Sequence, residues 1–230
     1  MISRADGSTA KKPTKLETIH EKLEEKYGPC DMSDVKNPLD LAIFAYISLN
    51  LPLEEAFRAF QAFKANFVDW NEVRISSARE VQDVLRAGDE PLEHALFIKD
   101  FLQRVFIDNH HVGLDFLRDR TISEIRTFFR KAGRFPDVGV NLVLIDLKEY
   151  AVVPLQASTH ACLKKLGGVK SESPTLQEMK SLSSQIPADK ILSLVLYLGE
   201  HARNGSPALK KAAAKKPAKA TKKATKKASK

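Results

Sequence analysis

The feature that most constrains the fold is the stretch of residues 121–167, in which helical signals follow one another with very short connections. Thr121 and Glu124 have the spacing of a capping box, and Gly133 is a stop signal for the helix that they open. After a tight turn, residues 138–147 are apolar enough for a buried helix. A short extended crossing leads to a third helix. This order predicts two helices joined by a tight turn and followed by a third.

Helix start signals recur through the rest of the chain. Capping residues precede three further apolar segments, at Thr14 with Glu17, Asn37 with Pro38, and Ser77 with Glu80. Strand-like alternation is absent, and we interpret residues 67–74 as an extended connector. Trp70 in that connector is expected to be a core anchor, because large aromatic side chains are usually buried. The sequence therefore predicts an all-α body of about ten helices.

The composition is that of a globular chain with enough apolar material for one substantial core or two small lobes. Hydrophobic residues make up 43% of the 230 residues. No apolar run approaches the ~18 residues that span a bilayer, so no membrane association is expected. The N-terminal segment lacks the apolar middle of a signal peptide, and Cys30 and Cys162 suggest no disulfide framework. These features indicate an intracellular protein.

The basic character of the chain lies almost entirely in its C-terminal tail. Ten lysines and no acidic residue fall within residues 210–230, so removing them from the net charge of +8 leaves −2 for the other 209 residues. A segment rich in lysine and alanine cannot pack a core, and we expect it to be disordered and to bind double-stranded DNA. It resembles the C-terminal tails of linker histones and of some bacterial nucleoid proteins. The lysines assigned to DNA binding are Lys210, Lys211, Lys215, Lys216, Lys219, Lys222, Lys223, Lys226, Lys227 and Lys230.

Several segments of the body resemble, in the same order, the endonuclease III family of helix-hairpin-helix DNA glycosylases. The family's hairpin reads LPGVGRKTANVVL and is followed by VDTH, to which NLVL at 141–144 and ASTH at 157–160 are similar. Residues 37–50 are similar to the family's SPFELLIAVLLSAQ, and residues 186–201 to its last helix. The resemblance extends over about residues 16–203 and implies a two-lobed helical glycosylase fold with a disordered basic tail.

The resemblance also implies where catalytic residues would stand. Bifunctional members use a lysine of the hairpin as a nucleophile on the sugar, and an aspartate of the later helix stabilises the developing positive charge. Here the matching positions hold Val138 and Ser158. Neither side chain offers an amine or a carboxylate, so we expect base-excision chemistry to be lost or strongly weakened, with no catalytic residue at these positions.

Two further positions are expected to contact DNA. The family's Gly-Val-Gly turn, which brings backbone N–H groups to a phosphate, is replaced by Arg134, Phe135 and Pro136. Arg134 could contact the phosphate with its guanidinium, although an arginine in a polar turn is often only solvated. Asn50 stands where the family has a glutamine that fills the gap left by a flipped nucleotide. A role as the last residue of a helix is equally compatible with Asn50.

An alternative interpretation is that the protein is an active glycosylase or abasic-site lyase. Two extra residues separate the hairpin from Thr159, so the register could shift and bring Lys131 or Lys148 forward as a nucleophile. Asp137 would then supply the carboxylate near the mouth of the pocket. Such a site requires a lysine ammonium and a carboxylate within ~4 Å across a concave pocket.

The remaining expectations concern organisation, cofactors and location. We expect residues 1–13 to be disordered, residues 14–205 to form the helical body, and residues 206–230 to form the tail. The family's iron–sulfur cluster requires four cysteines after the last helix, where this chain has none, so no cofactor is expected. A monomer is expected, in the cytoplasm and on the nucleoid, or in the nucleus of a eukaryote. Two other interpretations remain: an architectural nucleoid protein, and a tail that serves solubility or RNA binding.

Overall fold

The computed structural model describes residues 12–86, 90–133 and 135–209, and all regular structure in these ranges is helical. The α-helices are α1 (Lys15–Tyr27), α2 (Pro38–Asn50), α3 (Leu53–Asn66), α4 (Trp70–Ile75), α5 (Ala78–Leu85), α6 (Pro91–Asn109), α7 (Ile122–Lys131), α8 (Asp137–Lys148), α9 (Ala157–Lys165), α10 (Leu176–Ser183) and α11 (Ile191–Arg203), with 3₁₀ turns η1 (Asp115–Asp119) and η2 (Ala188–Lys190). The predicted all-α fold class is confirmed. Within the described ranges, no helix is long and apolar enough to cross a membrane.

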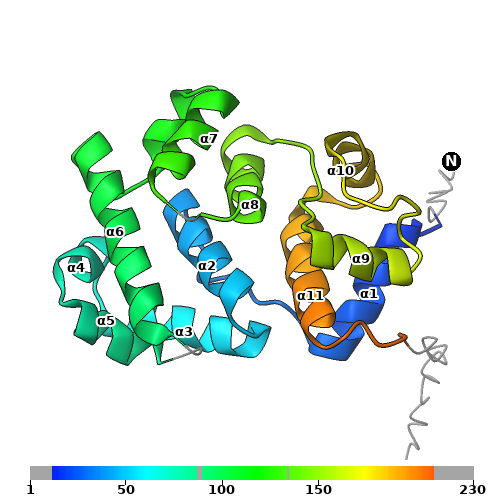
Figure 1. Cartoon of the computed structure of the whole chain (residues 1–230), viewed down its shortest axis with the longest axis horizontal. Helices are drawn as coiled ribbons and strands as arrows, with labels where there is room; N and C mark the ends of the chain where they lie inside the picture. The colour runs from blue at the N-terminus through cyan, green and yellow to red at the C-terminus, as the bar shows by residue number, and fades with distance from the viewer. Residues whose placement is uncertain (1–11, 87–89, 134, 210–230) are drawn as a thin grey trace, which may run out of the picture.

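The helices form two lobes that lie side by side (Figure 1). The larger lobe holds α2 to α8, and α2 is its central element, with all residues from Pro38 to Ser48 buried. This helix packs against α3 and α8, and a buried helix of this kind is apolar on every side. In the smaller lobe, α11 packs against α1 and α9. Because α1 precedes the larger lobe in the chain and α9 follows it, the smaller lobe joins both ends of the body.

The helix starts inferred from the sequence are present in the structure. Thr14, Ser77 and Thr121 each form a full capping box with the glutamate three residues later. Asn37 accepts a hydrogen bond from the Asp40 amide, and a proline occupies the first turn of the same helix. Capping needs only residues within one turn of each other, which is why these starts can be read from sequence alone.

One local prediction was wrong: residues 67–74 are not an extended connector. Helix α4 begins at Trp70, and the Asp69 side chain caps it by accepting from the Glu72 amide at 2.8 Å. Asp69 and Glu72 have the capping spacing, but the helix that follows is too short to show a periodic apolar pattern. Trp70 itself is buried, as expected for a core anchor.

A buried carboxylate fixes this connection to the central helix. Asp40 is fully buried and accepts hydrogen bonds from the Trp70 indole at 2.6 Å and from the Lys64 ammonium at 2.5 Å. The Lys36 amide and the Asn37 side chain donate to its other oxygen, both at 3.0 Å. Four donors satisfy a charge that would otherwise be costly to bury. The network holds α2, α3 and α4 together.

Candidate functional site between the two lobes

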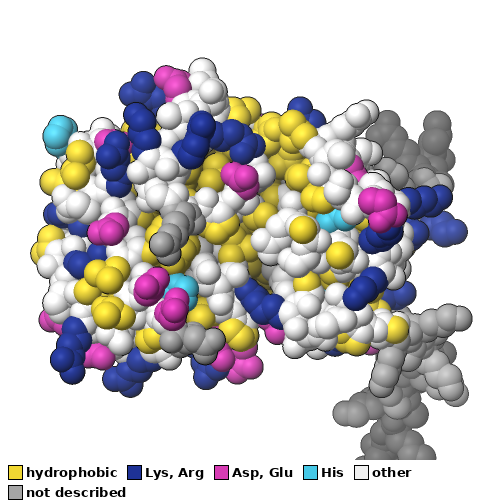
Figure 2. Space-filling view, viewed as in Figure 1, with side chains coloured by type: hydrophobic (Ala, Val, Ile, Leu, Met, Phe, Trp, Pro, Cys, Tyr) yellow, Lys and Arg dark blue, Asp and Glu magenta, His cyan; other side chains and the backbone are white. Residues whose placement is uncertain are grey.

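A cavity of about 190 Å³ lies where α2, α8, α9 and α11 meet, between the two lobes. Its walls combine apolar side chains with a few polar groups, as is usual for ligand sites. Figure 2 shows hydrophobic side chains in the region between the lobes on the face in view. The residues that line the cavity are Ser48, Leu49, Leu142, Gln156, Ser158, Val195, Leu196, Gly199, Ala202 and Arg203.

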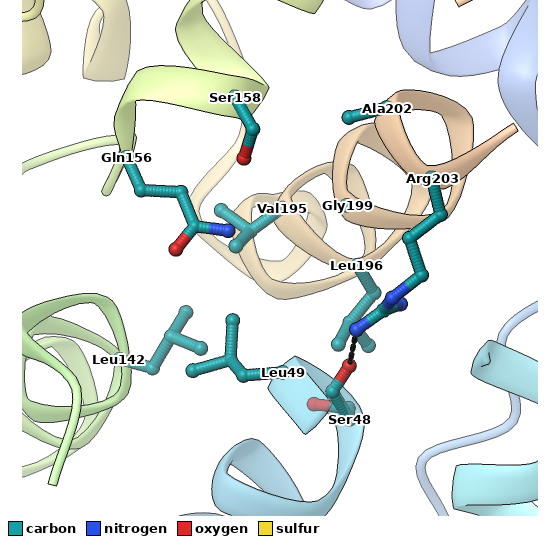
Figure 3. A pocket seen from close by; sticks show the side chains of 10 residues that line it. All are labelled: Ser48, Leu49, Leu142, Gln156, Ser158, Val195, Leu196, Gly199, Ala202 and Arg203. Atoms are coloured by element: carbon teal, nitrogen blue, oxygen red, sulfur yellow. Dashed lines mark hydrogen bonds between the residues drawn. The ribbon is translucent and has the colours of Figure 1, made fainter. Parts of the chain in front are cut away.

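Ser158 reaches this cavity because α9 begins just after the chain crosses between the lobes. The Thr159 hydroxyl accepts from the Gln156 amide at 3.0 Å and donates to the Gln156 carbonyl at 3.1 Å, which closes the first turn of α9. The Ser158 hydroxyl and the Gln156 amide group both point toward the cavity (Figure 3). The structure therefore brings the predicted position Ser158 to the site and adds Gln156 beside it.

Val138, the other position matched to a catalytic residue, does not line the cavity. It lies in the first turn of α8 with only 6% of its surface exposed, among the residues of the hydrophobic core. Leu142, one turn further along α8, is the residue of that helix that faces the cavity. The sequence comparison thus placed Ser158 and Val138 in one site, whereas the fold brings Ser158 together with Leu142.

Arg203 is the one charged side chain among the residues that line the cavity. Its Nη2 donates to the Ser48 carbonyl at 2.9 Å (Figure 3). Its Nη1 lies 3.6 Å from a carboxylate oxygen of Glu200. Burial lowers the pKa of Arg203, and the charge of Glu200 opposes this effect. An arginine nevertheless stays protonated in proteins. The cavity therefore contains a permanent positive charge, while the described residues place no lysine, histidine or carboxylate in its lining.

The residues proposed for a shifted register lie away from this cavity. Asp137 is exposed at the start of α8, and Lys131, at the end of α7, lines a different, open depression on the outer side of the larger lobe. The Lys148 ammonium donates to the Arg118 carbonyl near η1. None of these residues belongs to the lining of the interlobe cavity.

The hairpin turn between α7 and α8 is anchored by an aromatic side chain. Phe135 is buried, with its ring 4.8 Å from that of Phe129 and 5.2 Å from that of Phe101. Pro136 occupies the N-cap of α8, and no side chain caps this helix end. Because Pro136 precedes the first turn of α8, its missing N–H takes no amide donor away from that turn. The amide groups of the first turn include that of Gly139. Arg134 lies outside the described residues.

Gly139 is required for this packing. A Cβ atom at this position would lie 2.8 Å from the Phe135 Cε1 atom, closer than carbon atoms approach one another. The glycine in the first turn of α8 thus leaves space for the ring that fills the turn. A phenylalanine at position 135 and a glycine four residues later form one packing unit.

Asn50 is the last residue of α2 and is exposed at the junction with α3. Its side-chain amide donates to the Tyr46 carbonyl at 2.7 Å, so it satisfies one of the terminal carbonyl groups of its own helix. The neighbouring residues Ser48 and Leu49 line the cavity. Asn50 therefore lies next to the site, while its side chain is engaged with α2.

A second hydrogen-bond network fixes the first turn of α9 to the segment that follows this helix. His160 is buried, and its Nε2 lies 2.9 Å from the Ser171 hydroxyl and 3.0 Å from the Glu178 carboxylate. The Ser171 hydroxyl also donates to Glu178 at 2.5 Å. The two His160 contacts join α9 to the loop and to α10, and the third contact joins that loop to α10, so His160 has a structural role.

The donor set of the chain does not fit an iron–sulfur cluster. Such a cluster is usually held by four cysteine thiolates, and the full sequence has two cysteines. Cys162 is buried in α9 and Cys30 is half-buried before α2, and burial raises the pKa of both thiols, to about 12 for Cys30. In the described part of the chain, no three histidine, cysteine or acidic side chains are grouped to hold a metal ion.

Sequence reasoning did not single out Gln156 and Arg203, which line the cavity, or Glu200, which pairs with Arg203. They come from two segments more than 40 residues apart. The ten lysines of residues 210–230 lie outside the described residues, as does Arg134.

Comparisons with known proteins find a curated relative and solved structures of similar fold. No family model matches the sequence. A curated Arabidopsis thaliana protein that is named as a candidate DNA glycosylase is 26% identical over 218 residues, which cover 94% of this chain and 70% of that protein. The trapped covalent intermediate of endonuclease III with DNA has a similar fold, with a TM-score of 0.56, 14% identity, and coverage of 86% of this chain and 91% of that one. A thermostable thymine-DNA glycosylase is also similar, with a TM-score of 0.52, 10% identity, and coverage of 82% and 86%.

Proposed function

We propose that this chain is a member of the endonuclease III-like superfamily of helix-hairpin-helix DNA glycosylases, and that it binds double-stranded DNA but does not excise bases. The observation that supports the loss of excision most directly is the chemistry of the interlobe cavity.

Cleavage of a glycosidic bond builds positive charge on the sugar in the transition state. A carboxylate near the sugar stabilises that charge, and a lysine amine can attack the sugar carbon instead. The cavity has the hydroxyl of Ser158 where the superfamily has a carboxylate, and its charged group is the guanidinium of Arg203. That guanidinium is paired with Glu200, and no carboxylate among the described residues lines the cavity to stabilise a cationic transition state. The cavity is therefore better suited to binding than to excision.

The same cavity has features that fit an extruded nucleotide. Leu49, Leu142 and Val195 give it apolar walls for the face of a base, while Gln156 and Ser158 offer hydrogen-bonding groups for its edge. Unstacking costs less at a mismatched, damaged or abasic position than in an intact duplex. We therefore expect the body to prefer distorted duplexes, with Asn50 and Arg134 beside the opened strand.

Most of the affinity is expected to come from the C-terminal tail. The first 209 residues carry a net charge of −2, and the ten lysines follow them. If all ten lysines neutralised phosphates, the slope of log K against log salt would reach about −9, an upper limit. Binding of this kind does not depend on sequence. It would keep the protein on the nucleoid, or on chromatin in a nucleus, while the body discriminates among DNA structures.

The experiment that tests this proposal uses one abasic duplex and its intact counterpart. Borohydride trapping and strand nicking measure chemistry, and binding at several salt concentrations measures affinity. The full chain is compared with a full-length variant in which the ten tail lysines are replaced by glutamine. We expect no trapped or nicked product, a preference of the full chain for the abasic duplex, and a steep salt slope that the glutamine variant largely loses.

Three outcomes would contradict parts of the proposal. Trapping or nicking would identify a working lysine nucleophile and restore the alternative of an active lyase. Equal affinity for the two duplexes would leave an architectural protein whose body does not read DNA structure. A salt slope that survives in the glutamine variant would place the phosphate contacts in the body.

A further inference from the structure

Two charged residues on one turn of α11 reach across to the other lobe. A carboxylate oxygen of Glu200 accepts a hydrogen bond from the Leu53 amide at 2.9 Å, and Arg203 donates to the Ser48 carbonyl at 2.9 Å. Leu53 is the first residue of α3, and Ser48 lies in the last turn of α2. The smaller lobe therefore contacts the end of α2 and the start of α3, at the junction of these two helices in the larger lobe.

The charges suit the helix ends that they contact. The N-terminus of α3 has a proline, Pro52, at its N-cap and no side-chain cap from its own sequence, so Glu200 provides the acceptor that α3 lacks. The partial positive charge at a helix N-terminus favours a carboxylate, and the partial negative charge at a C-terminus favours a guanidinium. Glu200 and Arg203 also form an ion pair at 3.6 Å, and the Asn204 side chain donates to Glu200 at 3.0 Å. The two contacts thus support each other.

This junction carries two parts of the candidate site. Asn50 lies between the two contact points, and Ser48 and Arg203 line the cavity. The Glu200 side chain is 15% exposed and that of Arg203 is 32% exposed, so solvent screens the pair only in part. A movement of α11 away from the junction would widen the cavity and displace Asn50 together.

We propose that Glu200 and Arg203 form an interlobe latch whose closed state sets the shape of the cavity and the position of Asn50, and thereby the preference for distorted duplexes. This inference rests on the proposed function, because the preference belongs to the same cavity. Neither residue is catalytic: both are positioning residues that act through Ser48, Leu53 and the turn between them. Opening the latch abolishes discrimination and leaves the tail-driven affinity for intact DNA in place.

The test compares three variants in the full chain. Glu200→Ala removes the acceptor for the Leu53 amide, and Glu200→Gln keeps a neutral acceptor of the same size. The matched control is Asp108→Ala, which removes the partner of Arg104 from an exposed ion pair within α6. Three properties are measured, the first two being hydrogen exchange of the Leu53 amide without DNA and the ratio of affinities for the abasic and the intact duplex. A pair of spin labels, one on α6 and one on α10, reports the separation of the lobes.

We expect exchange of the Leu53 amide to become about ten- to a hundredfold faster in Glu200→Ala, because a hydrogen bond to a charged group is lost. Glu200→Gln is expected to have an intermediate effect, and Asp108→Ala none. The affinity ratio should fall toward one in the same order, while binding to the intact duplex stays within about twofold.

Any other result contradicts either the latch or the proposed function on which it rests. Fast exchange with an unchanged affinity ratio would show that the contact is only structural. Unchanged exchange and unchanged lobe separation in Glu200→Ala would show that no latch exists. If the unaltered chain does not prefer the abasic duplex, the proposed function fails, and exchange with label separation still decides whether Glu200 holds the lobes together.

Discussion

Because Phe135 packs against Gly139, we predict that Gly139→Ala destabilises the protein when Phe135 is present and stabilises it when Phe135 is replaced by alanine. Gly139→Ala alone should gain about 1 kcal/mol from helix propensity. The new Cβ atom would lie 2.8 Å from the Phe135 ring, and overpacking of this kind costs about 1–3 kcal/mol. The ring cannot move away easily, because Phe101 and Phe129 surround it. We therefore expect Gly139→Ala to destabilise the protein by up to about 2 kcal/mol.

Phe135→Ala removes the ring and should cost about 3–5 kcal/mol, as for other buried phenylalanines. In that background the nearest remaining neighbour of an alanine Cβ at position 139 is the Ala45 Cβ atom at 3.7 Å, which is an ordinary contact. Gly139→Ala should then stabilise the protein by about 1 kcal/mol. The interaction between the two sites is therefore expected to be about 1–3 kcal/mol, within the range for residues in direct contact.

The assay is urea unfolding of the four proteins, followed by the fluorescence of Trp70. This residue is the only tryptophan of the chain and lies in the core of the larger lobe, which also holds the hairpin. Midpoints give the stability changes, provided that the slopes remain equal. If Gly139→Ala has the same effect in both backgrounds within about 0.5 kcal/mol, the ring does not restrict position 139 and the reasoning is refuted.

Two further predictions concern buried groups away from the cavity. Asp40→Asn should destabilise the protein by about 2–4 kcal/mol, less than the loss of a fully buried ion pair would, because Lys64 is partly exposed. The urea midpoint measures this change. It should be much smaller for the control Asp146→Asn, whose carboxylate forms an exposed ion pair. Burial lowers the pKa of His20 and of His201 below 6.5, so the unfolded state binds more protons, and stability present above about pH 6.5 should be lost as the pH falls toward the lowered values. Urea midpoints at pH 7.5 and 5.5 measure this loss, and an equal loss in a His20→Gln, His201→Gln variant would rule out these two residues as its source.

Sequence reasoning succeeded where the causes are local. The caps at Thr14, Ser77 and Thr121 each depend on a glutamate three residues away, and the structure has all three. The hairpin of two helices and the third helix after it follow from apolar periodicity and stop signals, and the structure has them in that order. The short helix α4 was missed because six residues are too few to show a period, although Asp69 gave a capping signal.

The composition of the cavity could not be read in the same way. Aligning the hairpin placed Val138 and Ser158 together, but the fold turns Val138 into the core and presents Leu142 to the cavity. The alignment transferred residue types but not the position of the cavity along α8. Val138 and Leu142 lie four residues apart on the same side of the helix, about 6 Å along its axis, so a cavity one turn further on is lined by Leu142 instead of Val138.

The sequence by itself determined the all-α class, the helix starts, the separation of a near-neutral body from a lysine-rich tail, and the absence of an amine and a carboxylate at the two aligned positions. Those properties depend on composition or on residues within one turn of each other. Only the tertiary structure brought Ser48, Ser158 and Arg203 to one cavity and placed Glu200 at the start of α3. These residues come from helices that are far apart in the chain, so their contacts arise from packing between lobes, which no local pattern encodes.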